Sequence, residues 1–405
     1  MSMLRLAWAY LLARPLLTLL HVAMLGIGVG TMILLLLFTS QAEERLARDA
    51  RPVDLVVGAK GSPLQLIMSS VLHIDVPTGN IPYAEALRLA TNPMIATATP
   101  VSLGDSFRGF RIVGTDASFL ALYGARVSEG KAFEQPMDAL LGATVARRSG
   151  LAPGAQLVGT HGLASAGTAH QEHPYRVVGV LAPTGTVVDR LVLTPLASVW
   201  AVHEKHLDAH ADHDEDAAHE PKDESKREIT ALLVKYRTPL AAALLPRQVN
   251  STTSMQAASP AYEMARLMNL LGVGVDVLRV FAIVLMVTAA ASMFVALMSA
   301  LQERRYDLAL LRALGARPAT LFALLACEGV TLVVAGVILG LLLGHACASV
   351  LGSWIARSQP WSITGFAWVG AEAWVVLAVL AAGAATSLIP ALQAYRRDPA
   401  LLLKR

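Results

Sequence analysis

Four long apolar stretches restrict what this chain can fold into more than any other feature. They cover residues 16–38, 280–301, 319–351 and 373–392, and each reaches the roughly 20 helical residues that cross a hydrocarbon core. Backbone groups in hydrocarbon must be hydrogen-bonded within their own segment, so each stretch is predicted to be a transmembrane helix. Composition agrees, because 405 residues that are 55% hydrophobic and 16% charged are too apolar for an ordinary soluble enzyme.

The first stretch has a second interpretation, a cleavable signal peptide. Arg5 and Arg14 precede it, and the small-residue sequence Ser40-Gln41-Ala42 follows it. The apolar region of a signal peptide is only about 7–15 residues long, whereas this one is longer and interrupted only by His21. A retained helix is therefore favoured. Residues 1–15 form a basic amphipathic segment with interfacial aromatic residues, which we expect along the cytoplasmic headgroups.

Basic residues near the short flanks of these stretches predict the orientation. They gather on one side of the predicted membrane, at Arg5, Arg14, Arg304, Arg305, Arg312, Arg317, Arg396, Arg397, Lys404 and Arg405. The opposite connection, 352–372, carries only Arg357. The positive-inside rule then predicts that both termini are cytoplasmic and that the large polar region is periplasmic, in a bacterial inner-membrane protein.

The polar region 39–279 is predicted to be an α+β domain inserted between the first two transmembrane helices. Short β-like runs at 53–57, 110–113, 175–180 and 191–193 alternate with helical patterns at 83–90 and 195–202. Residues 41–50 and 261–279 continue the helical pattern of the flanking spans and are predicted to form a two-helix stalk. No disulfide is expected, because the two cysteines, Cys327 and Cys347, lie far apart in one apolar stretch.

The predicted organisation follows from these boundaries. In chain order it comprises a cytoplasmic segment 1–15, a first span 16–38, the domain 39–279 with a His- and acid-rich insertion at 203–228, a second span 280–301, a cytoplasmic loop 302–318, a third span 319–351, a periplasmic loop 352–372, a fourth span 373–392 and a cytoplasmic tail 393–405. The third span is longer than a bilayer requires, so we expect it to tilt or project.

The loop 302–318 reads Gln-Glu-Arg-Arg-Tyr-Asp-Leu-Ala-Leu-Leu-Arg-Ala-Leu-Gly-Ala-Arg-Pro. Leu308, Leu311 and Leu314 recur at helical spacing between charged residues, and Gly315 is placed to end the helix. The pattern predicts a short amphipathic helix on the cytoplasmic face, joined to two spans.

This loop resembles the coupling loop of MacB/FtsX/LolC-type permeases, which reads Glu-Arg-Arg-x-x-Ile/Leu-Ala-Leu-Leu-Arg-Ala-Leu-Gly-Ala. The resemblance extends along the chain, because one span, a large insertion and three C-terminal spans match that family's layout. The stretches 141–146 (Leu-Gly-Ala-Thr-Val-Ala) and 177–186 (Val-Val-Gly-Val-Leu-Ala-Pro-Thr-Gly-Thr) are similar to phrases of its periplasmic core.

The resemblance implies that the loop docks on an ABC ATPase. The residues implied in docking are Arg304, Arg305, Leu308, Leu311, Arg312, Leu314 and Gly315. The alternative is that these arginines are positive-inside anchors without a partner. The sequence has no Gly-x-x-x-x-Gly-Lys-Ser/Thr loop, so this chain is not expected to be an enzyme, and ATP and Mg²⁺ are expected on a separate ATPase subunit.

The family further implies a dimer of permeases. In this family the transmembrane helices relay ATP-driven closure of the ATPases to the periplasmic domains, a mechanism called mechanotransmission. An adaptor, a lipoprotein or an outer-membrane component is implied as a further partner. Few ionisable residues interrupt the spans, namely His21, Glu328 and His345, with Glu372 at an outer edge. No chain of charges marks a polar pathway. Glu328 is expected to pair with a loop arginine rather than contact a substrate.

The insertion contains His203, His206, His210 and His213, whose spacing of three, four and three places them on one face of a continued helix. Such a face could hold Zn²⁺, with Cu²⁺ or Ni²⁺ as less selective alternatives. The other interpretation is a solvated acidic loop without metal. His161, His170 and His173 match no metal signature and are expected to be surface residues.

Three functions remain open from the sequence. The permease drives export or extraction of a lipoprotein, peptide or amphiphile; or it activates a periplasmic partner without transport, as FtsX-type members do; or it is a metal-responsive sensor or transporter. The basic residues flank the membrane instead of forming a stripe, so nucleic acid is not an expected partner. No catalytic triad or carboxylate pair can be defined from spacing.

Overall fold

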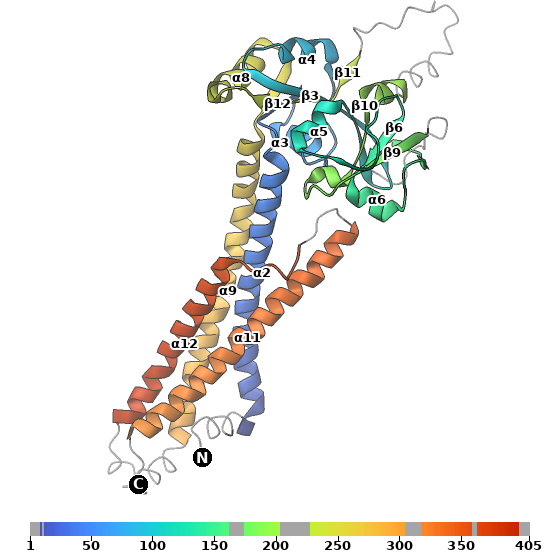
Figure 1. The fold of residues 1–405 in the computed structure, drawn as a ribbon. Helices are drawn as coiled ribbons and strands as arrows, with labels where there is room; N and C mark the ends of the chain where they lie inside the picture. Colours follow the sequence, from blue (N-terminus) through green and yellow to red (C-terminus); the bar gives the residue numbers. More distant parts are fainter. Residues whose placement is uncertain are drawn as a thin grey trace, which may run out of the picture. The chain divides into compact units, whose positions relative to one another are not determined.

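The computed structural model describes residue 9 and residues 12–161, 174–202, 227–303, 318–358 and 363–396 (Figure 1). The chain divides into two compact units. We call Met1–Glu43 with Leu270–Arg405 the helical unit, and Glu44–Asn269 the sheet unit.

Long helices make up the described part of the helical unit. They are α2 (Pro15–Ala50), α9 (Pro260–Glu303), α11 (Pro318–Ser358) and α12 (Gly370–Arg396). Each contains a segment long and apolar enough to cross a membrane, which confirms the predicted class of four candidate transmembrane helices with an α+β domain between the first two. Helices α2 and α9 are longer than a bilayer requires, and each has one end within the sheet unit.

The core of the helical unit is apolar. Val29, Ile33 and Leu37 of α2 are fully buried at four-residue intervals, and they belong to a cluster with Met293 of α9 and Val337 of α11. Residues four apart share one helix face, so this ridge fixes the side of α2 that faces its neighbours.

Helices α2 and α11 approach closely through glycines. A Cβ atom added at Gly340 of α11 would lie 2.6 Å from Cβ of Val29 and 3.0 Å from the carbonyl oxygen of Gly26. One added at Gly344 would lie 3.0 Å from the carbonyl oxygen of Gly30. Glycines spaced four apart on both helices form the small-residue interface that packs helices in lipid, where burial from water supplies no force between them.

The connection between α11 and α12 differs from its predicted bounds. The sequence placed a loop at 352–372, whereas α11 continues to Ser358 and α12 begins at Gly370. Gly352 lies within α11, and its missing side chain makes room for the backbone carbonyl group of Ile363. At the start of α12, the Glu372 side chain accepts a hydrogen bond from the Val369 N–H group (3.0 Å).

A large mixed sheet forms the centre of the sheet unit. Its order is β13-β1-β12-β3-β4-β10-β6-β9-β5, with β7 beside β9 and β8 beside β3, and a separate β11-β2 pair. The strands are β1 (Leu55–Ala59), β2 (Ile81–Pro82), β3 (Ile95–Phe107), β4 (Phe110–Thr115), β5 (Val127–Gly130), β6 (Asp138–Leu141), β7 (Gln156–Leu157), β8 (Thr160–His161), β9 (Tyr175–Leu181), β10 (Leu191–Pro195), β11 (Glu228–Ile229), β12 (Ala231–Tyr236) and β13 (Met255–Ala258). Pairs β4–β10 and β6–β9 are parallel.

Helices cover this sheet and bury two cores. They are α3 (Pro63–Ser70), α4 (Tyr83–Ala90), α5 (Ala117–Tyr123), α6 (Ala143–Ser149), the 3-10 helix η1 (Val187–Arg190), a helical segment at 196–202 and α8 (Pro239–Thr252). One core joins β1, β12 and β13 to α4 and α8, through residues such as Leu55, Val234 and Leu245. The other joins β4, β6, β9 and β10 to α6, through residues such as Ile112 and Val145.

Most predicted elements of this unit are confirmed. The runs at 110–113, 175–180 and 191–193 lie within β4, β9 and β10, and the helical pattern at 83–90 is α4. The run predicted at 53–57 is shifted, because β1 begins at Leu55. The Asp54 carboxylate accepts a hydrogen bond from the backbone N–H group of Tyr236 (2.8 Å), so the residue before β1 is bound to the neighbouring strand β12.

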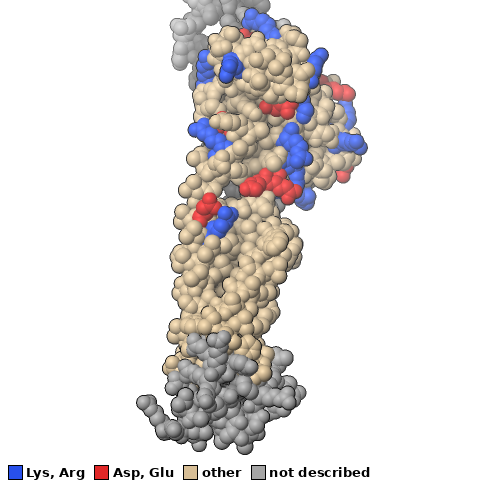
Figure 2. Space-filling view, turned by 90° about the vertical axis from the view of Figure 1, so that its left-hand side faces the viewer, with Lys and Arg blue, Asp and Glu red and all other residues tan. Residues whose placement is uncertain are grey.

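Charged side chains are unevenly distributed on the surface. In the space-filling view, Lys, Arg, Asp and Glu gather over the sheet unit, and the described face of the helical unit carries almost none (Figure 2). Exposed residues of α9 within this unit include Val273, Val280, Phe281 and Val287. Exposed apolar surface over the length of a helix is the pattern expected for contact with lipid.

Candidate functional site

Most site residues expected from the sequence lie outside the described residues. These are the loop residues Arg304, Arg305, Leu308, Leu311, Arg312, Leu314 and Gly315, and the insertion histidines His203, His206, His210 and His213. Of the expected site residues only Glu328 is described, buried in α11 beside Gly329, where an added Cβ would lie 2.3 Å from Cβ of Ser387 in α12. Within the described ranges, no group of three or more His, Cys, Asp and Glu side chains could hold a metal ion.

The described residues single out another site within the sheet unit, which we call the junction: the ends of α2 and α9 that belong to this unit, with strands β1 and β13. Helix α2 ends at Ala50 and β1 begins at Leu55, while β13 ends at Ala258 and α9 begins at Pro260. Strands β1 and β13 pair antiparallel, with Val56 opposite Ala258. Because the links between helix and strand are so short, a displacement of either helix end must reach a pair of hydrogen-bonded neighbouring strands.

Asp49 fixes the end of α2 to the sheet unit. Its side chain is buried (5% exposed), and its Oδ1 atom accepts a hydrogen bond from the backbone N–H group of Val187 (2.7 Å). Its Oδ2 atom lies 4.0 Å from Nη2 of Arg190, whose side chain is also largely buried. A carboxylate in the last turn of a helix opposes the helix dipole, and these partners in η1, together with Arg45 and Arg48 of α2, favour its charge.

The helix η1 is itself held rigidly. The Asp189 carboxylate accepts hydrogen bonds from the backbone N–H groups of Thr184 (2.7 Å) and Gly185 (2.9 Å). On its other side, a Cβ added at Gly142 would lie 2.3 Å from the carbonyl oxygen of Val188. The two core phrases that carry the family resemblance, 141–146 and 177–186, therefore meet at η1, directly beside the end of α2.

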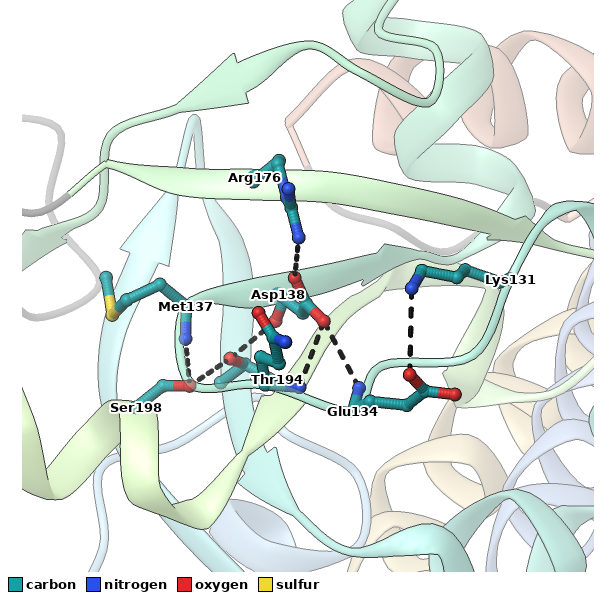
Figure 3. Close-up of polar contacts among 8 residues, drawn as sticks. Lys131, Glu134, Met137, Asp138, Arg176, Thr194 and Ser198 are labelled. Carbon is teal, nitrogen blue, oxygen red and sulfur yellow. Dashed lines mark hydrogen bonds and ion pairs between the residues drawn. The ribbon is translucent and has the colours of Figure 1, made fainter.

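A second network fixes the strands behind η1, and it centres on Asp138 in β6 (Figure 3). The carboxylate is 2% exposed and accepts hydrogen bonds from the backbone N–H groups of Glu134 (3.2 Å) and Gln135 (3.0 Å) and from Arg176 of β9 (3.0 Å). Burial alone would raise its pKa, but the hydrogen bonds from Gln135, Arg176 and Glu134 outweigh this, and the pKa lies below its usual range.

The same network extends to β10 and to the helical segment 196–202. The Thr194 hydroxyl donates to the Asp138 carbonyl oxygen (2.8 Å) and accepts from the Ser198 hydroxyl (2.8 Å), which in turn accepts from the Met137 N–H group (2.8 Å). Strands β6, β9 and β10 thus behave as one body.

Two histidines of the helical unit make polar contacts within its apolar surroundings. His21 of α2 lies 3.1 Å from the Ser292 hydroxyl of α9. His345 of α11 contacts the Gly365 carbonyl oxygen through Nδ1 (2.6 Å) and the Glu372 carboxylate of α12 through Nε2 (3.0 Å). These contacts fix one helix against another at separate positions, so the described residues do not line up as a charged path.

Sequence reasoning missed the junction residues Asp49 and Arg190 and the buried Asp138 of β6. Isolated charged residues near turns have no local signature, because their partners lie far away in sequence. The close packing of α2 against α11 does have a signal in the sequence. This signal is the four-residue spacing of Gly26 with Gly30 and of Gly336 with Gly340 and Gly344.

Comparison with known proteins covers almost the whole chain. The family model for the MacB-like periplasmic core domain matches residues 18–252, and the FtsX-like permease C-terminal model matches residues 279–399. No curated protein sequence matches the chain significantly.

Two solved structures resemble part of the chain. One is the periplasmic region of MacB from Actinobacillus actinomycetemcomitans, at 12% identity and a TM-score of 0.35, covering 55% of this chain and 98% of that one. The other is the extracellular domain of the noncanonical ABC-type transporter YknZ from Gram-positive bacteria, at 10% identity and a TM-score of 0.30, covering 51% of this chain and 99% of that one.

Proposed function

Because this chain belongs to the family of permeases that combine a MacB-like periplasmic core domain with an FtsX-like C-terminal region, we propose that it is the membrane subunit through which a separate ABC ATPase moves a periplasmic domain. In this proposal ATP and Mg²⁺ bind the ATPase, which docks on the loop 302–318. The basic residues that flank the spans favour a cytoplasmic location for this loop and a periplasmic one for residues 39–279.

The observation that most supports mechanical transmission is the junction. Both long helices lead by short links into the paired strands β1 and β13, and Asp49 joins the end of α2 to η1 through a buried hydrogen bond. Rigid elements joined by buried polar contacts can carry a displacement over a long distance. The core of the helical unit is apolar, which disfavours passage of a polar substrate between the helices. It therefore favours a mechanism in which the sheet unit moves.

Docking is tested by placing a photo-activated cross-linking residue at Leu308 or Leu311 in living bacteria. We expect both positions to cross-link to an ABC ATPase. A matched probe at Leu87, which is exposed in α4 of the sheet unit, should give no such product. If instead a membrane-impermeant reagent labels residues 302–317 from outside the cell, the proposed orientation and the docking are both wrong.

The proposed cargo is a lipoprotein, peptide or amphiphile that is exported or extracted in the periplasm, and the permease is proposed to act as a dimer. Purification of the complex with its ATPase, followed by identification of bound periplasmic proteins, separates transport from activation. A lipoprotein or an outer-membrane duct component supports transport, and a cell-wall hydrolase supports an activator without cargo.

The insertion 203–228 is proposed to bind Zn²⁺ through His203, His206, His210 and His213. Their spacing supports this proposal, since it places four imidazole groups on one helix face. Titration of Zn²⁺ into the full-length protein should give micromolar affinity that is lost when His206 and His210 are replaced by Ala. Unchanged Zn²⁺ affinity in the double variant would contradict zinc binding by these histidines.

A further inference from the structure

A groove of about 610 Å³ opens on the sheet unit beside its edge strand. Strand β13 and helix α8 line it together with Lys60 and Gly61, which follow β1, and with Tyr262 and Glu263 in the first turn of α9. Its volume falls within the usual size of a small-ligand site. The proposed ATPase docking does not involve these residues.

Glu263 is the unusual member of this lining. Its side chain is 5% exposed, and its Oε2 atom is buried without a hydrogen bond. The nearest cation is Arg266, one turn along the helix, whose Nη1 atom lies 3.8 Å from Oε2 and whose side chain is 58% exposed. A pair of that length with a solvated arginine compensates a buried carboxylate only weakly.

Two neighbouring polar side chains, Asn250 and Gln256, already have hydrogen-bond partners. The Asn250 side-chain amide forms two hydrogen bonds with the backbone of Ala257. It accepts from the N–H group (2.7 Å) and donates to the carbonyl oxygen (3.3 Å). The Gln256 side-chain oxygen accepts from the Gly61 N–H group (2.7 Å). Asn250 thereby blocks the edge of β13 against strand addition at Ala257, and Glu263 remains as the acceptor that a ligand could use.

The rest of the lining indicates the kind of ligand. Pro63, Pro246 and the exposed ring of Tyr262 supply apolar surface, and an aromatic face also attracts cations. A single carboxylate without further acidic or imidazole ligands does not suit a divalent metal. Lys60, on the same groove, can bind the carbonyl or carboxylate oxygens that accompany an amine in a polypeptide.

We propose that this groove binds a primary ammonium group carried on an apolar peptide segment, with Glu263 as the counter-ion. The ammonium supplies the hydrogen bonds that Oε2 lacks, and the apolar residues beside it pack on Tyr262 and Pro246. Since Glu263 belongs to the first turn of α9, an occupied groove changes the surroundings of the helix exactly where it leaves β13.

The test uses the full-length protein in nanodiscs of phosphatidylglycerol, which contain no lipid amine. The probe is N-acetyl-Ala-Lys-Ala-amide, its matched control is the peptide with norleucine in place of lysine, and binding is followed by saturation-transfer NMR of the peptide. We expect the lysine peptide to bind at least tenfold more tightly than the norleucine peptide. Glu263→Gln should remove that difference, and Glu129→Gln, at an exposed position in β5, should keep it.

Thermal unfolding separates a ligand site from a structural role. A carboxylate kept for binding destabilises the empty protein, so Glu263→Gln should unfold at the same temperature as the parent or above it. The proposal is overturned if the two peptides bind equally, if neither binds at millimolar concentration, or if Glu263→Gln keeps the lysine preference. Displacement of the lysine peptide when phosphatidylethanolamine is added to the nanodiscs would assign the groove to a lipid headgroup instead.

Discussion

At the scale of single residues, buried charges decide how the sheet unit is held together. Asp138 and Asp49 are both 5% exposed or less, and each accepts a hydrogen bond from a backbone N–H group outside its own helix or strand. A buried carboxylate stabilises a fold only when its hydrogen bonds offset the loss of hydration, so removing one partner costs more than the contact itself contributes.

Asp138→Asn should lower the stability of the protein at neutral pH. The pKa of Asp138 is lowered in the folded state, so its ionisation contributes stability above the unfolded pKa of ~3.9, and that contribution is lost as pH falls through the folded pKa. The loss at pH 7 should be about 1.5–3 kcal/mol, the usual contribution of a hydrogen bond to a charged group. Unfolding curves of parent and variant should converge at acidic pH.

The control for that experiment is Asp276→Asn. Asp276 forms an exposed i,i+3 pair with Arg279 on α9 (2.7 Å), and exposed pairs contribute little. An equal loss of stability in both variants would show that the buried network around Asp138 has no special role.

Asp49 and Arg190 should be energetically coupled. Each of the variants Asp49→Ala and Arg190→Ala leaves a buried partner behind, and the double variant removes both. A double-mutant cycle on unfolding should therefore give a coupling of about 1–3 kcal/mol, in the range found for contacting residues. Additive effects would mean that the 4.0 Å separation is too long for the pair to hold α2 against η1.

At the scale of elements, close helix packing in the helical unit depends on glycine. Gly340→Val should separate α2 from α11, because its side chain would collide with Val29 and the backbone of Gly26. Overpacking of this kind costs about 1–3 kcal/mol, which should appear as a lower unfolding temperature in detergent. Gly272→Ala is the matched change, since nothing lies within 4 Å of an added Cβ there, and it should be neutral or stabilising.

Elements with a strong local pattern were predictable from the sequence, whereas contacts between distant residues were not. The long apolar stretches and the pattern at 83–90 mark helices by themselves. Strand order was not predictable, because β1 pairs with β12 and β13, about two hundred residues later, and nothing local encodes that register. Asp49 is a single acidic residue at a helix end, and its role follows only from the position of Val187.

At the scale of the whole molecule, the account depends on force passing from the cytoplasmic loop to the junction. Leu311→Asp would place a charge on the apolar face that is proposed to dock. Disrupting a central apolar contact at an interface typically costs about 2 kcal/mol or more, or roughly 30-fold in affinity. The variant should therefore need a correspondingly higher ATPase concentration to form the complex, measured by co-purification, while Arg147→Ala in α6 should bind as the parent does.

Hydrogen–deuterium exchange on the complex of this permease with its ATPase tests transmission most directly. The peptides to compare are 187–190 of η1 and 255–263 of β13 and α9, with and without vanadate-trapped nucleotide. The account predicts that trapping changes exchange at both peptides and that Leu311→Asp abolishes the change. Identical exchange at the junction in the two nucleotide states, in a complex that hydrolyses ATP, would contradict it.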